Sequence, residues 1–182
     1  ARFVLMNLTI ENASLPAESS LTLEDKWILS KYNTVVKEVS DNLDNYEIGI
    51  ALAKIYDFIW DVFCDWYIEI AKIRLQKDGA EAQNARQVLV WVMSNTLKLL
   101  HPFMPFITEE IWQTLPHDGE TIMKAPWPVF SDELVFTEDE DQMNIIMDAI
   151  RAIRNRRGEM NVPPSRKAHV YIATEKKDIF SL

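Results

Sequence analysis

Residues 99–112, LLHPFMPFITEEIW, predict a sharp corner between two helices. Proline lacks the amide proton and fixes φ, so Pro102 ends one helix and Pro105 suits the start of the next. We expect Glu109 and Glu110 in the first turn of that second helix, where carboxylates interact favourably with the positive end of the helix dipole. The corner is therefore a helix–helix connection packed with Phe, Met and Trp side chains.

Upstream of the corner, three segments have the apolar spacing of amphipathic helices. In the first, Thr22 is a predicted N-cap with Asp25 three residues on, and an apolar stripe follows. The second runs over residues 45–76, which at 1.5 Å per residue gives a strut of roughly 45 Å, and Gly79 is expected to close it as the C′ residue. The third covers residues 80–100.

Downstream of the corner, a short helix is predicted over residues 107–115. An extended linker rich in proline begins at Pro116 and is expected to lie over the bundle, pinned by Trp127. A further helix starts with a capping box at Thr137 and continues to Gly158. The run 168–173, AHVYIA, is typical of a strand.

Short connections between long amphipathic helices imply antiparallel neighbours. We therefore expect a mainly α fold, an antiparallel helical bundle with the start of a small α+β C-terminal segment. Residues 2–10 would add the tail of one more helix. The predicted division is a helical bundle over 1–125, followed over 126–182 by the linker, the basic-ended helix and the first strand of a truncated C-terminal region. A chain of this kind, with no starting Met, is expected to be a piece of a longer protein.

The composition limits the classes of function. The 182 residues carry 19 Lys and Arg against 28 Asp and Glu, a net charge of −9. Because phosphate binding rests mainly on Lys and Arg, any RNA site must be a local patch. The single cysteine, Cys64, excludes an internal disulfide and fits a reducing compartment. No run of about 18 uncharged apolar residues indicates a membrane span.

The residues do not support catalysis. Cys64 and the histidines are scattered, without the spacing of a metal site. The four glycines are isolated, so the sequence has no phosphate-cradling loop. Asp65 and Glu69 lie one turn apart like paired carboxylates, but Lys72 offers Glu69 an ion pair on the helix surface. We predict no catalytic residue, metal site or cofactor in this chain.

A basic cluster occupies residues 151–167, with six Lys and Arg against one Glu. Two interpretations remain open. Acidic residues at the start of a helix and arginines at its end complement the helix dipole. Alternatively, arginines present bidentate forks to RNA phosphates, and the candidate contacts are then Arg151, Arg154 and Arg157.

Arg2 and Phe3 form a second candidate RNA site. A cation beside an aromatic ring suits an unstacked base, because the ring offers a stacking face and the guanidinium a phosphate contact. The alternative is that Phe3 belongs to the core with Val4 and Met6.

Three motifs resemble the valyl-tRNA synthetase family, within the valyl, isoleucyl and leucyl group of class I synthetases. They are FCDWYIE at 63–69, HPFMPFITEEIW at 101–112 and RNRRGEMNVPPSRK at 154–167, in the order expected for that family. The resemblance covers nearly the whole chain. It implies an anticodon-binding helical bundle, with the tRNA for valine as partner and Arg2, Phe3, Arg151, Arg154 and Arg157 as its contacts.

The same resemblance implies a parent enzyme. That enzyme would be a cytoplasmic, monomeric valine–tRNA ligase that uses ATP with magnesium in protein synthesis. Neither HIGH nor KMSKS occurs here, so the catalytic domain of the same chain would be a further partner rather than part of this segment. Two alternatives stay open: an isoleucyl- or leucyl-type domain, which FCDWYIE and NVPPSRK disfavour, and a helical protein-interaction scaffold without RNA binding, which predicts an exposed apolar patch.

Overall fold

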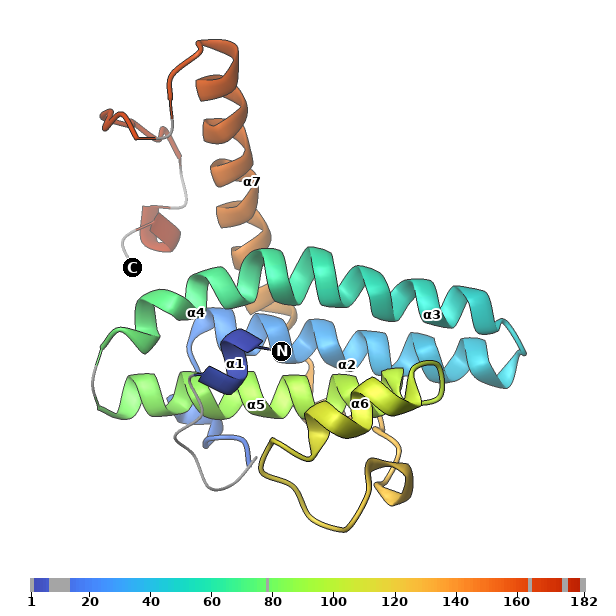
Figure 1. Ribbon diagram of the computed structural model, residues 1–182. Coiled ribbons are helices and arrows are strands. Elements are labelled where there is room, and N and C mark those ends of the chain that lie inside the picture. Colours follow the sequence, from blue (N-terminus) through green and yellow to red (C-terminus); the bar gives the residue numbers. More distant parts are fainter. Residues whose placement is uncertain (1, 7–13, 78, 164, 175–176, 181–182) are drawn as a thin grey trace. The chain divides into compact units, whose positions relative to one another are not determined.

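The computed structural model describes residues 2–6, 14–77, 79–163, 165–174 and 177–180, and its regular elements are helices (Figure 1). The α-helices are α1 (Arg2–Met6), α2 (Leu23–Asp44), α3 (Ile48–Asp57), α4 (Ile68–Leu75), α5 (Ala80–Leu100), α6 (Pro105–Trp112) and α7 (Thr137–Glu159). The other helical elements are the π-helix η2 (Phe58–Tyr67) and the short 3-10 helices η1 (Glu18–Ser20), η3 (Ile122–Lys124), η4 (Asp132–Leu134) and η5 (Lys177–Phe180). The mainly α fold class is confirmed.

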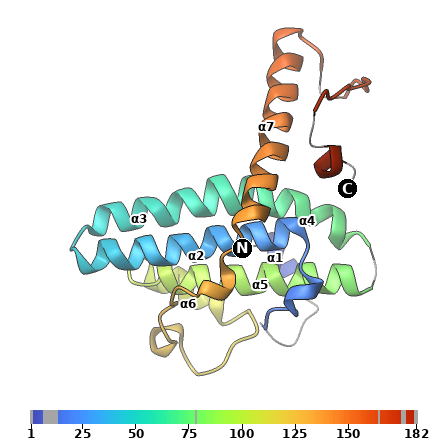
Figure 2. The same ribbon diagram turned by 180° about the vertical axis from the view of Figure 1, so that it is seen from behind.

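The chain forms two compact units, Ala1–Phe136 and Thr137–Leu182. In the first unit, α2, α5 and the continuous run from α3 to α4 lie along one another (Figures 1 and 2). The short helices α1 and α6 both contact α5. The large buried side chains at the centre of this unit are Trp27, Tyr32, Phe58, Tyr67, Leu89, Leu99 and Trp112.

The start of α2 has the predicted capping box. The Thr22 backbone N–H donates to the Asp25 carboxylate over 3.2 Å, and the Thr22 hydroxyl donates to the same oxygen over 3.0 Å. These bonds satisfy groups that a helix end otherwise leaves unpaired. The local sequence pattern therefore fixes where α2 begins.

Asp25 is also the centre of a buried polar network. Its other carboxylate oxygen accepts from the Tyr67 hydroxyl at 2.6 Å and from Arg74 Nη1 at 2.7 Å. The same Arg74 nitrogen donates to the Thr22 hydroxyl at 3.0 Å. Burial, followed by the charge of Asp25, raises the pKa of Tyr67 well above its ordinary value. The network joins the start of α2 to η2 and α4.

The helix predicted over residues 45–76 is present but is not α-helical throughout. Its middle, η2, is a π-helix, and at its end the Ile68 N–H donates to the Phe63 carbonyl, five residues back. The prediction that Gly79 is the C′ residue of this helix is wrong. The C-cap of α4 is Gln76, and Gly79 has φ +99° at the N-cap of α5, a conformation that glycine adopts readily.

The corner between α5 and α6 is confirmed, with Pro105 at the start of α6. The prediction that Glu109 and Glu110 lie in the first turn of α6 is wrong, because α6 begins four residues before Glu109. Instead, the Glu109 carboxylate accepts the Thr121 hydroxyl at 2.7 Å and the Ile122 N–H at 3.2 Å. Hydrogen bonds from Gln113 and Thr121 lower the pKa of Glu109. Glu109 thus fastens the segment after α6 to that helix.

The linker that follows lies on the bundle and is held by side-chain hydrogen bonds. Trp127 Nε1 donates to Ser40 Oγ at 3.0 Å, which confirms the predicted pin. Asn33 exchanges two bonds with the Ser131 backbone, 2.7 Å to its carbonyl and 2.9 Å from its N–H. Residues up to Phe136 therefore belong to the first compact unit.

In the second unit, α7 covers the predicted helix, and residues 168–173 carry neither helix nor strand. Here the structure differs from the predicted strand. A β-strand needs a neighbouring strand to pair with its backbone N–H and C=O groups. The described residues contain no strand that could do so.

Candidate nucleic-acid interface

The first candidate site is at α1, where Arg2 is exposed, Phe3 is half-buried and Val4 is buried. Lys72 of α4 lies over the Phe3 ring, with Nζ 5.5 Å from the ring centroid. This spacing is that of a cation–π contact. Phe3 is therefore neither a fully buried core residue nor a detached side chain: it packs against the bundle and keeps part of its surface exposed.

Lys72 is the residue of this site that sequence reasoning missed. Its predicted ion pair with Glu69 is present at 2.5 Å. Its contact with Phe3 joins residues far apart in the sequence, and no local spacing signals it. Lys72 therefore adds to the exposed Arg2 a second cation, which lies over the Phe3 ring, and cations with an aromatic ring are the groups that bind single-stranded RNA.

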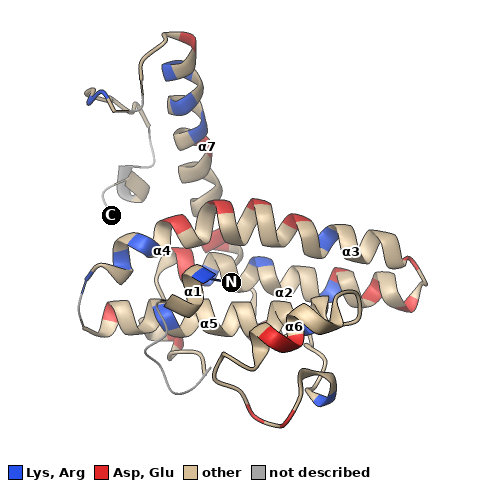
Figure 3. Cartoon of the chain, viewed as in Figure 1, with Lys and Arg blue, Asp and Glu red and all other residues tan. Residues whose placement is uncertain are grey.

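The second candidate site is the last part of α7, where the blue bands of the cartoon in Figure 3 mark the positions of arginines. Arg151, Arg154 and Arg157 follow one another at intervals of three residues, so they share one face of the helix. Arg151 pairs with Asp148 at 3.0 Å, one turn earlier. Arg156, on the other side of the helix, pairs with Glu159 at 2.8 Å.

The guanidinium of Arg157 is bound to backbone carbonyls. Nη2 donates to the carbonyls of Pro163 and Arg166, at 2.6 and 2.8 Å. These bonds hold the chain after α7 against the helix. They also help to shape a cavity of about 580 Å³ lined by Arg157, Arg166, Lys167, Ala168 and His169, whose basic side chains suit an anion.

The structure brings the predicted residues together in two groups. Arg2 and Phe3 adjoin on α1 in the first unit, and Arg151, Arg154 and Arg157 share a face of α7 in the second. Both interpretations of the basic cluster retain support, because the arginines stand at the C-terminal end of α7, with Glu138, Asp139 and Glu140 in its first turn.

Chemistry other than binding gains no support from the described residues. They contain no group of three or more His, Cys, Asp or Glu able to hold a metal ion. Burial raises the pKa of the Cys64 thiol, which disfavours the reactive thiolate. None of the described helices is long and apolar enough to cross a membrane.

Comparison with known proteins shows a family whose members this chain resembles. Residues 25–172 match the family described as the anticodon-binding domain of tRNA ligase. The chain is 48% identical over 182 residues to a valine–tRNA ligase of Carboxydothermus hydrogenoformans, covering 100% of this chain and 21% of that protein. It is 46% identical to the valine–tRNA ligase of Geobacillus stearothermophilus, covering 98% of this chain and 21% of that protein. The chain thus spans about a fifth of the length of the curated relatives it matches.

Proposed function

Because this chain belongs to the anticodon-binding domain family of tRNA ligases, we propose that it binds the anticodon loop of the tRNA for valine as part of a valine–tRNA ligase. The observation that carries the proposal is the family match over residues 25–172, which includes the bundle from Asp25 onward and the basic end of α7, while α1 lies before it. The names of the relatives favour valine over isoleucine or leucine.

In this proposal, residues 1–125 hold the anticodon loop, and residues 126–182 lead from the bundle towards a C-terminal region. An unstacked base lies against Phe3, while Arg2 and Lys72 contact its phosphates. Arg151 and Arg154 contact further phosphates, and Arg157 shapes the basic cavity beside them. Stacking on splayed bases and contacts to phosphates are the usual means of recognising a single-stranded RNA loop.

The parent enzyme would activate valine with ATP and magnesium and transfer it to the tRNA, in the cytoplasm and as a monomer. We assign that chemistry to a catalytic domain of the parent enzyme, since the glycines here are isolated and HIGH and KMSKS do not occur. This segment contributes by holding the anticodon loop while the acceptor end is positioned elsewhere.

The test is titration of a labelled valine anticodon stem-loop, and of one with a permuted anticodon, at several salt concentrations. We expect preference for the valine anticodon, binding that weakens as salt rises, and a further loss with Phe3→Ala. Phe106→Ala is a matched control, because Phe106 is 90% exposed on α6 and outside the site. Equal binding of the two anticodons, or the same loss in both variants, would contradict the proposal.

One observation favours the scaffold alternative. Large apolar side chains are exposed near the α2–α3 turn and at the start of α6, including Tyr46 at 89% and Phe106 at 90%. A protein-interaction surface of this kind would be indifferent to RNA. Under that alternative no variant at Arg2 or Phe3 changes stem-loop binding, whereas under the main proposal both reduce it.

A further inference from the structure

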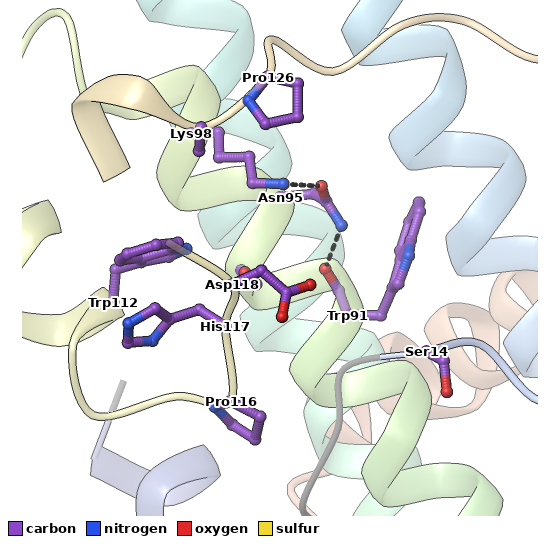
Figure 4. Close-up of a pocket in the computed structure, with 11 residues that line it drawn as sticks. Ser14, Trp91, Asn95, Lys98, Trp112, Pro116, His117, Asp118 and Pro126 are labelled. Atoms are coloured by element: carbon purple, nitrogen blue, oxygen red, sulfur yellow. Dashed lines mark hydrogen bonds between the residues drawn. The ribbon is translucent and has the colours of Figure 1, made fainter. Parts of the chain in front are cut away.

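A pocket in the first unit is not used by the sites described above. It lies between α5, α6 and the segment after α6 and has a volume of about 540 Å³ (Figure 4). Its lining residues include Trp91, Asn95, Lys98, Trp112, His117 and Asp118. This volume is within the range of small-ligand pockets, about 300–1,000 Å³.

The walls of the pocket are flat and aromatic. Figure 4 shows Trp91 on one side and Trp112, with His117 against it, on the other. The rings of Trp112 and His117 have centroids 3.8 Å apart, and Pro116 and Pro126 add apolar surface. Flat aromatic and proline surfaces accept a planar ring better than they accept a flexible chain.

The polar groups of the pocket include both donors and acceptors. Lys98 Nζ donates to Asn95 Oδ1 at 3.1 Å, and Asn95 Nδ2 donates to the Trp91 carbonyl at 2.9 Å, so Asn95 is fixed in place. Trp112 is 1% exposed, and its Nε1 has no hydrogen-bond partner among the described residues. Asp118 supplies an exposed carboxylate to the pocket. With one lysine and one carboxylate among its lining residues, the pocket suits an uncharged ring better than a phosphate group.

We infer that this pocket holds one unstacked nucleobase of the tRNA loop, flat against the half-buried Trp91 indole, with its exocyclic amino group donating to Asp118. A carboxylate accepts such an amino group directly. Adenine, cytosine and guanine carry one and uracil does not, so the pocket distinguishes the first three bases from uracil. The inference rests on the proposed function and adds a base-reading site to it.

The test uses stem-loop RNAs that lack one loop base at a time, titrated against the chain, Trp91→Ala and Asp118→Asn. At one loop position we expect loss of the base to weaken binding to the unaltered chain about tenfold, since stacking of one base on an aromatic ring has an effect of that order. The same loss should matter much less in Trp91→Ala. At that position, uracil should bind more weakly than an amino-bearing base, and Asp118→Asn should reduce the difference.

Trp60→Ala is the matched control, because Trp60 is 52% exposed and lies on η2 outside the pocket. Trp91 contacts Tyr32 edge to face at 5.3 Å, so circular dichroism must show that Trp91→Ala is folded. Asp118 is exposed, so its variant tests the pocket independently of folding.

If no loop position couples to Trp91 or Asp118 while Phe3→Ala still weakens binding, the inference is overturned and the proposed function stands. If the unaltered chain binds no stem-loop, the proposed function fails and the pocket inference fails with it.

Discussion

Pairs of arginine and carboxylate occur in both units but differ in their exposure to water. In the first unit, the side chains of Arg74 and Asp25 are 5% and 0% exposed. In the second, those of Arg151 and Asp148 are 55% and 74% exposed, and those of Arg156 and Glu159 are 72% and 63% exposed. The chemical groups and the distances are similar, so burial is the main difference between them.

Burial changes what such a pair does. A buried charge loses its hydration, so each member of the Asp25 network needs the others to remain bound. An exposed pair contributes little to stability, because water and salt compensate its loss. An exposed arginine can therefore exchange a carboxylate for an RNA phosphate at small cost, whereas Arg74 cannot leave Asp25 without unfolding its surroundings.

The largest effect is expected for Arg74→Met. It leaves the Asp25 carboxylate buried without its cation, and breaking a buried pair in this way costs about 3–5 kcal/mol. Urea unfolding should show this loss in the free energy of unfolding. The control is Arg156→Met, which removes an exposed arginine.

The double variant Asp25→Leu/Arg74→Met refines this prediction. Removing both charges should recover much of the loss, because the larger part of the single-variant cost is the unpaired charge. A loss below about 1 kcal/mol for Arg74→Met would show that water replaces the guanidinium and that the pair is not effectively buried.

The next largest effect is expected for Tyr67→Phe, which removes a hydrogen bond to a charged group and should cost about 1.5–3 kcal/mol. Burial, and then Asp25, raises the pKa of Tyr67 in the folded state, so the unfolded chain ionises first. Stability should therefore be retained below about pH 10, the ordinary tyrosine pKa, and fall above it.

Thermal unfolding between pH 8 and 11 measures this dependence, and Tyr67→Phe should reduce it. Tyr32 contributes in the same direction, because burial alone raises its pKa. Tyr46→Phe is the control, since Tyr46 is 89% exposed. An identical pH profile for the unaltered chain and Tyr67→Phe would disprove the coupling.

Arg154→Gln is expected to have a smaller effect, and on RNA binding instead of stability. Loss of one phosphate contact should weaken stem-loop binding several-fold and reduce the slope of log K against log salt by about 0.7–0.9. Arg156→Gln, on the opposite side of α7, should leave the slope unchanged. Equal slopes for all three proteins would favour the interpretation that these arginines only complement the helix dipole.

Arg156→Gln is expected to have the smallest effect, a slight change in stability. Its pair with Glu159 is exposed, so the free energy of unfolding should change by no more than about 0.5 kcal/mol. Urea unfolding of this variant beside Arg74→Met compares the two environments directly. A change above 1 kcal/mol would mean that the exposed pair has a structural role that its exposure does not reveal.

The features that the sequence predicted well depend on neighbouring residues. The capping box at Thr22, the corner at Pro105 and the ion pair between Glu69 and Lys72 all arise within four residues of chain. The missed features join distant residues: Arg74 reaches Asp25 across 49 positions, and Lys72 lies over Phe3. Local periodicity carries no information about such contacts.

The candidate site was predicted to the same extent. Residue type and spacing predict Arg2, Phe3 and the arginines of α7 as RNA contacts, and this stays a prediction. The binding of Arg157 to the carbonyls of Pro163 and Arg166 depends on how the chain turns after the helix and could not be predicted. The aromatic pocket was missed because Trp91, Trp112 and His117 come from different elements. No sequence pattern links Trp91 to the other two residues.

The π-helix η2 makes the bundle sensitive to chain length. Hydrogen bonds that span five residues instead of four accommodate more residues in each turn, which changes the direction in which every later side chain points. Deleting one residue within Phe58–Tyr67 would leave a good helical sequence but would rotate α4 and carry Arg74 away from Asp25. In this segment the number of residues matters as much as their chemistry, and substitutions should be tolerated where the deletion of one residue is not.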